Sequence, residues 1–122
     1  MQKILTFELK EEKKQGLRKI CQQLEIDWKE VPVKDYTQQM GCIAGITGFH
    51  RQRLIYRGDA FWAEMLVFSG MDSGQIDAFL AAYKQSGLQA IPLKAVLTEY
   101  NVKWTAKALF SELLKEHMAM NR

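Results

Sequence analysis

The segment from Pro92 to Trp104 carries the residues best suited to hold an anion. Lys94, Thr98 and Asn101 lie between the end of an expected strand and the start of an expected helix. The first N–H groups of a helix have no partner within the helix, so helix N-termini attract carboxylates and phosphates. Trp104 lies off the apolar stripe of that helix and could contact a ligand or a protein partner. We therefore expect a site for a small anionic ligand or a protein partner around Lys94, Thr98, Asn101 and Trp104.

A purely structural alternative accounts for the same residues. Asn101 would only cap the helix, Lys94 would be a solvated lysine that protects an edge strand from aggregation, and Trp104 would pack under residues 95–100. Both interpretations stay open from the sequence.

A second candidate site is the glycine-rich stretch Gly41–Gly48 with the basic residues that follow it. Glycines let backbone N–H groups approach a phosphate, and Arg51 and Arg53 could pair with it. The stretch lacks the Gly-Lys-Ser/Thr of a P-loop and the GxGxxG that opens a dinucleotide-binding helix. A mobile linker with a solvated basic face is the alternative.

The enzyme alternative uses Cys42 with His50 and the nearby arginines. A thiolate activated by an imidazolium or a guanidinium would be a nucleophile. Cys21 lies on an expected helical stripe and is therefore expected in the core. The acidic residues, cysteines and histidines show no metal-ligand spacing, so we expect no metal and no cofactor.

Composition and charge exclude several classes of protein. The chain has 122 residues, of which 48% are hydrophobic and 25% charged, as in an ordinary folded domain, so we expect one domain over residues 1–122. The formal net charge is only +3, and the charged residues are spread along the chain. Nucleic-acid binding through Arg51, Arg53 and Arg57 is therefore the least favoured of the three functional hypotheses. Neither a disulfide framework, a signal peptide nor a membrane span is indicated, so we expect a cytoplasmic protein that does not bind membranes.

An internal repeat supplies the elements that must position these residues. Residues 3–34 and 64–94 each read as strand, helix and strand, with a connecting segment over 35–60. The first strands are apolar runs, Lys3–Phe7 and Glu64–Phe68. The helices follow, and Asp72 with Gln75 has the spacing of a capping box. The second strands share an apolar-Pro-apolar-Lys pattern at residues 30–34 and 90–94.

The prolines favour an α+β fold. Proline cannot donate to a sheet ladder, so the segments with Pro32 and Pro92 should lie at the edges and the unbroken runs at the centre. Two such units fit a ferredoxin-like sandwich, with an antiparallel sheet covered on one face. The alternative is a small parallel α/β sheet, which a crossover helix at residues 36–44 would favour; a loop with a short helix there would favour the antiparallel form.

A last helix is expected over residues 102–117, with Asn101 as its N-cap. Its apolar stripe predicts that it covers an open part of the sheet or joins a second subunit, which makes a homo-oligomer one expectation.

The C-terminal half resembles a known family. Met65-Leu66-Val67-Phe68-Ser69-Gly70, the block Pro92-Leu93-Lys94-Ala95-Val96-Leu97-Thr98, and Asn101, Trp104, Glu112-Leu113 and Glu116-His117 are similar to the bacterial family of domains of unknown function numbered thirty-seven eighty-three. The resemblance implies a small bacterial cytosolic protein and brings with it no activity, cofactor or partner. From the residues we expect a non-enzymatic small-ligand or protein-binding and regulatory module.

Overall fold

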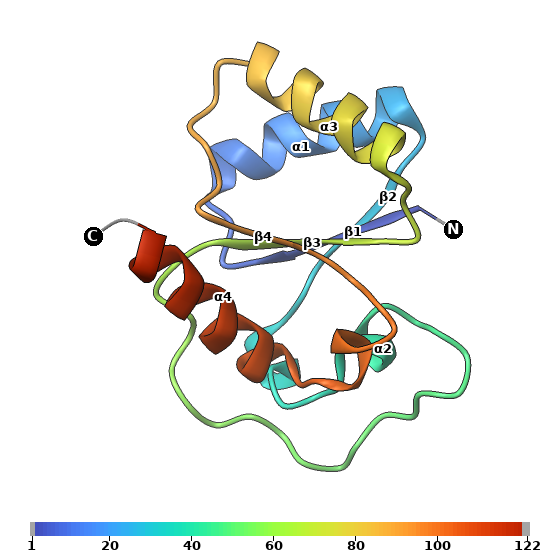
Figure 1. Ribbon diagram of the computed structural model, residues 1–122, viewed down its shortest axis with the longest axis vertical. Coiled ribbons are helices and arrows are strands. Elements are labelled where there is room, and N and C mark those ends of the chain that lie inside the picture. The colour runs from blue at the N-terminus through green and yellow to red at the C-terminus, as the bar shows by residue number, and fades with distance from the viewer. Residues whose placement is uncertain (1, 121–122) are drawn as a thin grey trace.

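Four strands and four α-helices build the structure, a computed structural model that describes residues 2–120 (Figure 1). In chain order the elements are β1 (Lys3–Phe7), α1 (Glu11–Leu24), β2 (Asp27–Glu30), the 3-10 turn η1 (Val33–Asp35), α2 (Met40–Ile43), β3 (Met65–Ser69), α3 (Ser73–Gln85), β4 (Leu93–Val96), the 3-10 turn η2 (Asn101–Lys103) and α4 (Ala106–Met120).

The sheet has the order β2-β1-β3-β4, and the prediction that the proline-containing segments lie at its edges is confirmed. The strand bounds predicted for those segments are wrong. Pro32 follows β2, whereas Pro92 precedes β4, so the shared apolar-Pro-apolar-Lys pattern falls at different places in the two halves. β2 and β4 have four residues each, which keeps the open edges of the sheet short.

The sheet is mixed, and the α+β class is correct while the ferredoxin-like arrangement is not confirmed. β1 pairs parallel with β2 and β3 pairs parallel with β4, whereas the central pair β1 and β3 is antiparallel. The physical reason is that α1 and α3 each return the chain to the neighbouring strand, which makes a parallel pair. In a ferredoxin-like sheet each crossover would skip one strand. The segment after β2 forms only η1, the short α2 and a long loop, the connection expected for antiparallel joining of the halves.

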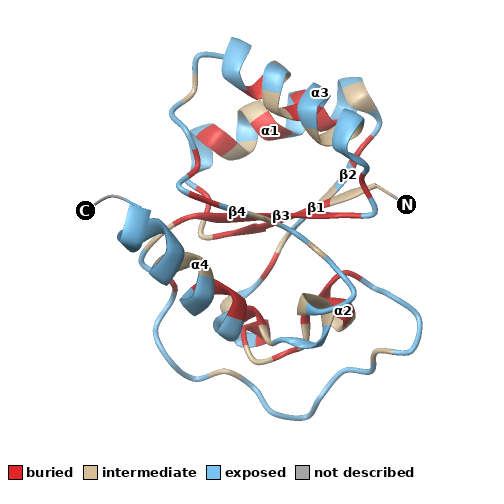
Figure 2. Cartoon of the chain, in the orientation of Figure 1, coloured by how far each residue is buried: buried red, intermediate tan, exposed pale blue. Residues whose placement is uncertain are grey.

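Helices cover both faces of the sheet, and each face has its own core (Figure 2). On one face α1 and α3 pack over Ile4, Leu66 and Phe68. On the other, α4, α2 and the chain around them pack over Leu5, Phe7 and Val67. This alternation along β1 and β3 follows from the two-residue period of a strand.

The ends of the helices are set by local chemistry. At α3 the predicted capping box is present, because the Asp72 side chain accepts from the Gln75 N–H and the Gln75 side chain accepts from the Asp72 N–H. At α4 the predicted start is wrong. Asn101 belongs to η2, and the helix begins at Ala106, where the Thr105 hydroxyl accepts from the Ala108 N–H at 3.1 Å.

Cys21 is 2% exposed, so its expected place in the core is confirmed. Burial and, to a smaller degree, the nearby Asp27 carboxylate raise the pKa of its thiol from 9.0 to about 12. Above pH 9 the unfolded chain releases this proton while the folded chain keeps it. The free energy of unfolding should therefore fall as the pH rises from 9 towards 12, by at most about 1.4 kcal/mol per pH unit.

Urea unfolding between pH 8 and pH 11 checks this prediction. Cys21→Val should flatten the slope relative to Cys42→Ser, a matched variant that keeps the Cys21 thiol. Tyr36 and Tyr83 also have raised pKa values, so they add a background slope of the same sign in every variant. Equal slopes in wild type and Cys21→Val would contradict the prediction.

Candidate functional site

A cavity of about 320 Å³ lies beneath α3, between that helix, the sheet and the segment that leads to β4. Phe79, Leu80 and Tyr83 reach it from α3, and Leu66 reaches it from β3. The remaining lining residues come from the end of α3, the connecting segment and β4: Lys84, Leu88, Ala90, Ile91 and Lys94. The walls are mostly apolar, and polar groups are few, which is the usual character of a small-molecule site.

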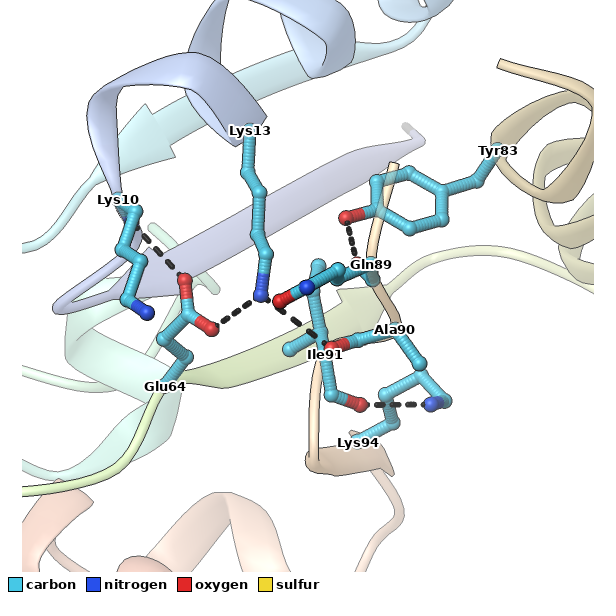
Figure 3. Close-up of polar contacts among 8 residues, drawn as sticks. All are labelled: Lys10, Lys13, Glu64, Tyr83, Gln89, Ala90, Ile91 and Lys94. Atoms are coloured by element: carbon cyan, nitrogen blue, oxygen red, sulfur yellow. Dashed lines mark hydrogen bonds and ion pairs between the residues drawn. The ribbon is translucent and has the colours of Figure 1, made fainter. Parts of the chain in front are cut away.

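The connecting segment that closes one side of the cavity is held by side chains from three elements (Figure 3). The Tyr83 hydroxyl donates to the Gln89 carbonyl at 2.7 Å. The Lys13 ammonium donates to the Ala90 carbonyl at 3.2 Å, and the Lys94 ammonium donates to the Ile91 carbonyl at 2.8 Å. Three successive carbonyls thus accept from α3, α1 and β4, which fixes an irregular stretch of backbone at the cavity wall.

The Lys13 ammonium that donates to the Ala90 carbonyl also forms a buried ion pair. Lys13 is 3% exposed, and its Nζ lies 2.5 Å from Glu64 Oε1. The second carboxylate oxygen, Oε2, accepts from the backbone N–H of Lys10 at 2.9 Å, at the start of α1. The carboxylate is thereby satisfied on both oxygens. Tyr83 lies near this charge: burial, then Glu64 and Glu12, raise the pKa of its phenol, so it is a neutral hydrogen-bond donor at pH 7.

Lys94 provides a positive charge at the cavity. Its ammonium has three N–H donors, and one of them is used on the Ile91 carbonyl. Lys84 lines the same cavity from the last turn of α3. The lining contains no acidic residue, and within residues 2–120 neither lysine forms an ion pair.

The structure separates Lys94 from the other three residues predicted to share its site. Lys94 lines the cavity beneath α3, whereas Thr98 and Asn101 hold the turn after β4. Asn101 Oδ1 accepts from the Thr98 N–H at 2.8 Å, and the Thr98 hydroxyl accepts from the Asn101 N–H at 3.2 Å. Asn101 Nδ2 also donates to the Val96 carbonyl at 3.0 Å. These two side chains are thus occupied in the turn, and Asn101 does not cap α4 as the structural alternative had it.

Trp104 lies between η2 and α4 with 40% of its surface exposed. Its carbonyl accepts from the N–H of Met40 at 2.8 Å and so joins the start of α4 to α2. The neighbouring Tyr100 is 73% exposed. The indole is thus partly available to a partner, but it does not line the cavity beneath α3.

Arg51 and Arg53 lie on the long connection between α2 and β3. Arg51 Nη2 pairs at 2.5 Å with the buried Asp35 carboxylate, which raises the pKa of the guanidinium and leaves less of it for a ligand. Arg53 is exposed. The side chain of the buried Gln38 donates to the Gln52 carbonyl at 2.9 Å and accepts from the Gln52 N–H at 2.7 Å. These two hydrogen bonds anchor the backbone of the connection at Gln52.

Cys42 lies in α2, partly buried, and His50 is exposed on the connection that follows. Within the part of the chain that the structure describes, no hydrogen bond joins the two side chains. The same residues contain no group of three or more histidine, cysteine or acidic side chains placed to hold a metal ion. Cys42 is near enough to Arg51 to add, as a smaller cause after Asp35, to the raised pKa of that guanidinium. The enzyme alternative stays a prediction.

Of the residues that line the cavity, the sequence had pointed to Lys94 alone. Phe79, Leu80 and Tyr83 appear in the sequence as an ordinary apolar stripe, which predicts a helix facing the core. An apolar stripe does not show whether the side chains packed against the helix leave a cavity beside it. Lys13 did carry a signal: it lies four residues before Leu17 on the stripe of α1, and a charged residue at such a position indicates a buried partner.

Comparison of the chain with known proteins gives a match to one protein family. No curated protein and no solved structure matches the chain. Among residues 2–120 no helix has the length and apolar character needed to cross a membrane. Residues 64–120, which include β3, α3, β4 and α4 and all the residues that line the cavity, match the family described as Domain of unknown function (DUF3783), and this match confirms the resemblance predicted from the C-terminal half.

Proposed function

We propose that this chain is a non-enzymatic binding module for a small molecule and that the cavity beneath α3 is its site. The observation that carries the proposal is the cavity itself: about 320 Å³ with a mostly apolar lining and two lysines. Small-molecule sites have volumes of about 300–1,000 Å³ and combine apolar walls with a few polar groups, so this cavity lies at the small end of that range.

The construction of the wall supports the same proposal. The three carbonyls of segment 89–91 are held by the side chains of Tyr83, Lys13 and Lys94. Those bonds keep the space open without a ligand, so binding need not reorganise the backbone. A preformed cavity with this lining favours ligand binding over a protein surface as the role of Lys94.

The proposed setting is the bacterial cytoplasm, as the family resemblance implies. Both cysteines are free thiols, and Cys21 is buried where oxidation would disturb the core.

Filling the cavity tests the proposal. A library of molecules with up to about ten non-hydrogen atoms is screened against the isotope-labelled chain by NMR. Ligands should shift the signals of Leu66, Leu80 and Leu88, and Leu80→Trp should abolish those shifts because the larger ring occupies the space. Ala81→Trp is the matched control, since Ala81 is the next residue on α3, is exposed and does not line the cavity.

The proposal fails if no compound shifts the lining residues, or if the shifts persist unchanged in a folded Leu80→Trp variant. Shifts grouped around Tyr100 and Trp104 instead would move the site to the η2 surface.

A further inference from the structure

We infer that the ligand of this cavity is a short monocarboxylic acid with an aliphatic body, whose carboxylate is bound by Lys94. This inference rests on the proposed function and adds the chemical class of the ligand. It follows from the charge at the cavity, from its size and from the hydrogen bonds of Lys94.

The lining sets the sign of the ligand's charge. It contains two lysines and no acidic residue, so a cationic ligand would meet like charges. Lys84 lies in the last turn of α3, where the helix dipole is negative, so its charge is partly offset there. Glu64 is neutralised by Lys13 at 2.5 Å. Of the two lining lysines, both of them exposed, Lys94 is therefore the one whose charge neither a helix end nor a carboxylate of the lining offsets.

The ammonium of Lys94 by itself matches a monoanion better than a phosphate. A phosphate brings about two negative charges and three acceptor oxygens, and sites for it commonly add the paired donors of an arginine or a helix N-terminus to any lysine. The cavity has neither: its lining includes no arginine, and the N-terminus of α3, at Asp72, is at the other end of the helix from Lys84. A carboxylate needs only the two N–H groups that Lys94 does not use on the Ile91 carbonyl.

Size and lining set the body of the ligand. At about 30 Å³ per water molecule, the volume of about 320 Å³ holds roughly ten waters or a molecule of similar size. Leu66, Phe79, Leu80 and Leu88 form apolar walls that offer no hydrogen bond to a hydroxyl or an amide. An unbranched acid of about eight carbons places its chain against these side chains and its carboxylate at Lys94.

The test uses three probes of equal chain length on the full chain: octanoate, 1-octanol and octylamine, each titrated by NMR at low and high salt. Octanoate should bind the tightest, and its affinity should fall with salt. Lys94→Met should weaken octanoate about tenfold, the usual effect of losing one charge-assisted hydrogen bond, and should leave 1-octanol unchanged. Lys94→Arg should restore most of the affinity. Lys29→Met is the matched control, because Lys29 is exposed on the other edge strand.

The outcomes separate this inference from the proposed function. If 1-octanol binds in the cavity as tightly as octanoate, or if Lys94→Met binds octanoate as wild type does, the cavity is a small-molecule site but the carboxylate assignment is wrong. If octylamine binds the tightest, the carbonyls of the connecting segment dominate and the assignment is also wrong. If none of the probes and no library compound shifts the lining residues, both proposals fail together.

Discussion

Replacing Lys13 by methionine should lower the free energy of unfolding by about 3–5 kcal/mol, the cost of leaving one member of a buried ion pair without its partner. Lys13 and Glu64 are 3% and 8% exposed, and the N–O distance between them is 2.5 Å. Methionine fills the space of the aliphatic stem but offers no donor to the carboxylate. Urea unfolding followed by circular dichroism measures the change.

Two further variants isolate the pair. Lys14→Met removes a neighbouring lysine of the same helix whose carboxylate partners are 3.6 and 3.9 Å away and partly exposed, so it should cost less than about 1 kcal/mol. Adding Glu64→Gln to Lys13→Met removes the unpaired charge but keeps an acceptor for the Lys10 N–H, and should recover part of the loss. A Lys13→Met variant as stable as Lys14→Met would contradict the importance of the pair.

The same substitution should loosen the wall of the cavity. Lys13 also donates to the Ala90 carbonyl, so its loss leaves the segment 89–91 with the bonds from Tyr83 and Lys94. Faster hydrogen exchange in residues 86–91 is the expected local effect. The ion pair therefore connects the stability of α1 and β3 to the shape of the proposed site.

Local signals in the sequence predicted the helices and strands. They did not predict how strands far apart in the sequence pair with one another. The Asp72 and Gln75 capping box and the edge positions of the proline segments depend on rules that act over a few residues, and both are present in the structure. Whether the two halves join by parallel or antiparallel strands depends on the connection 35–60 as a whole, which sequence patterns did not fix. The start of α4 was placed too early, because Asn101 and Thr105 are both suitable caps and the chain uses Thr105.

The residues that carry the family resemblance divide into two groups once their contacts are known. Thr98 and Asn101 maintain the turn, and Asn101 also occupies the Val96 carbonyl of the edge strand β4. An occupied carbonyl is one group fewer for edge-to-edge pairing with another chain. Lys94 belongs to the cavity instead. Nearness in sequence had suggested one site, but Lys94 is on β4 while Thr98 and Asn101 lie beyond its end, where the chain has turned away from the strand.

A second large loss of stability is expected from replacing Phe61. Its ring packs in the core and anchors the long connection between α2 and β3. Between residues 45 and 63 it is the single buried residue, at 8% exposure. Its ring stacks on Tyr36 with a centroid distance of 3.9 Å and on Phe110 with a distance of 4.1 Å. It thus joins the connection to Tyr36, which directly follows η1, and to Phe110 of α4.

Phe61→Ala should therefore lower the free energy of unfolding by about 3–5 kcal/mol, through lost burial and the cavity left between two rings. Trp62→Ala is the matched control: Trp62 is the next residue and a larger ring, but it is 73% exposed, so its loss should cost less than about 1 kcal/mol. Urea unfolding gives both values. Hydrogen exchange should rise across residues 45–63 in Phe61→Ala alone. A similar loss in both variants would mean that aromatic area near α4, rather than the stacked position of Phe61, stabilises this face of the sheet.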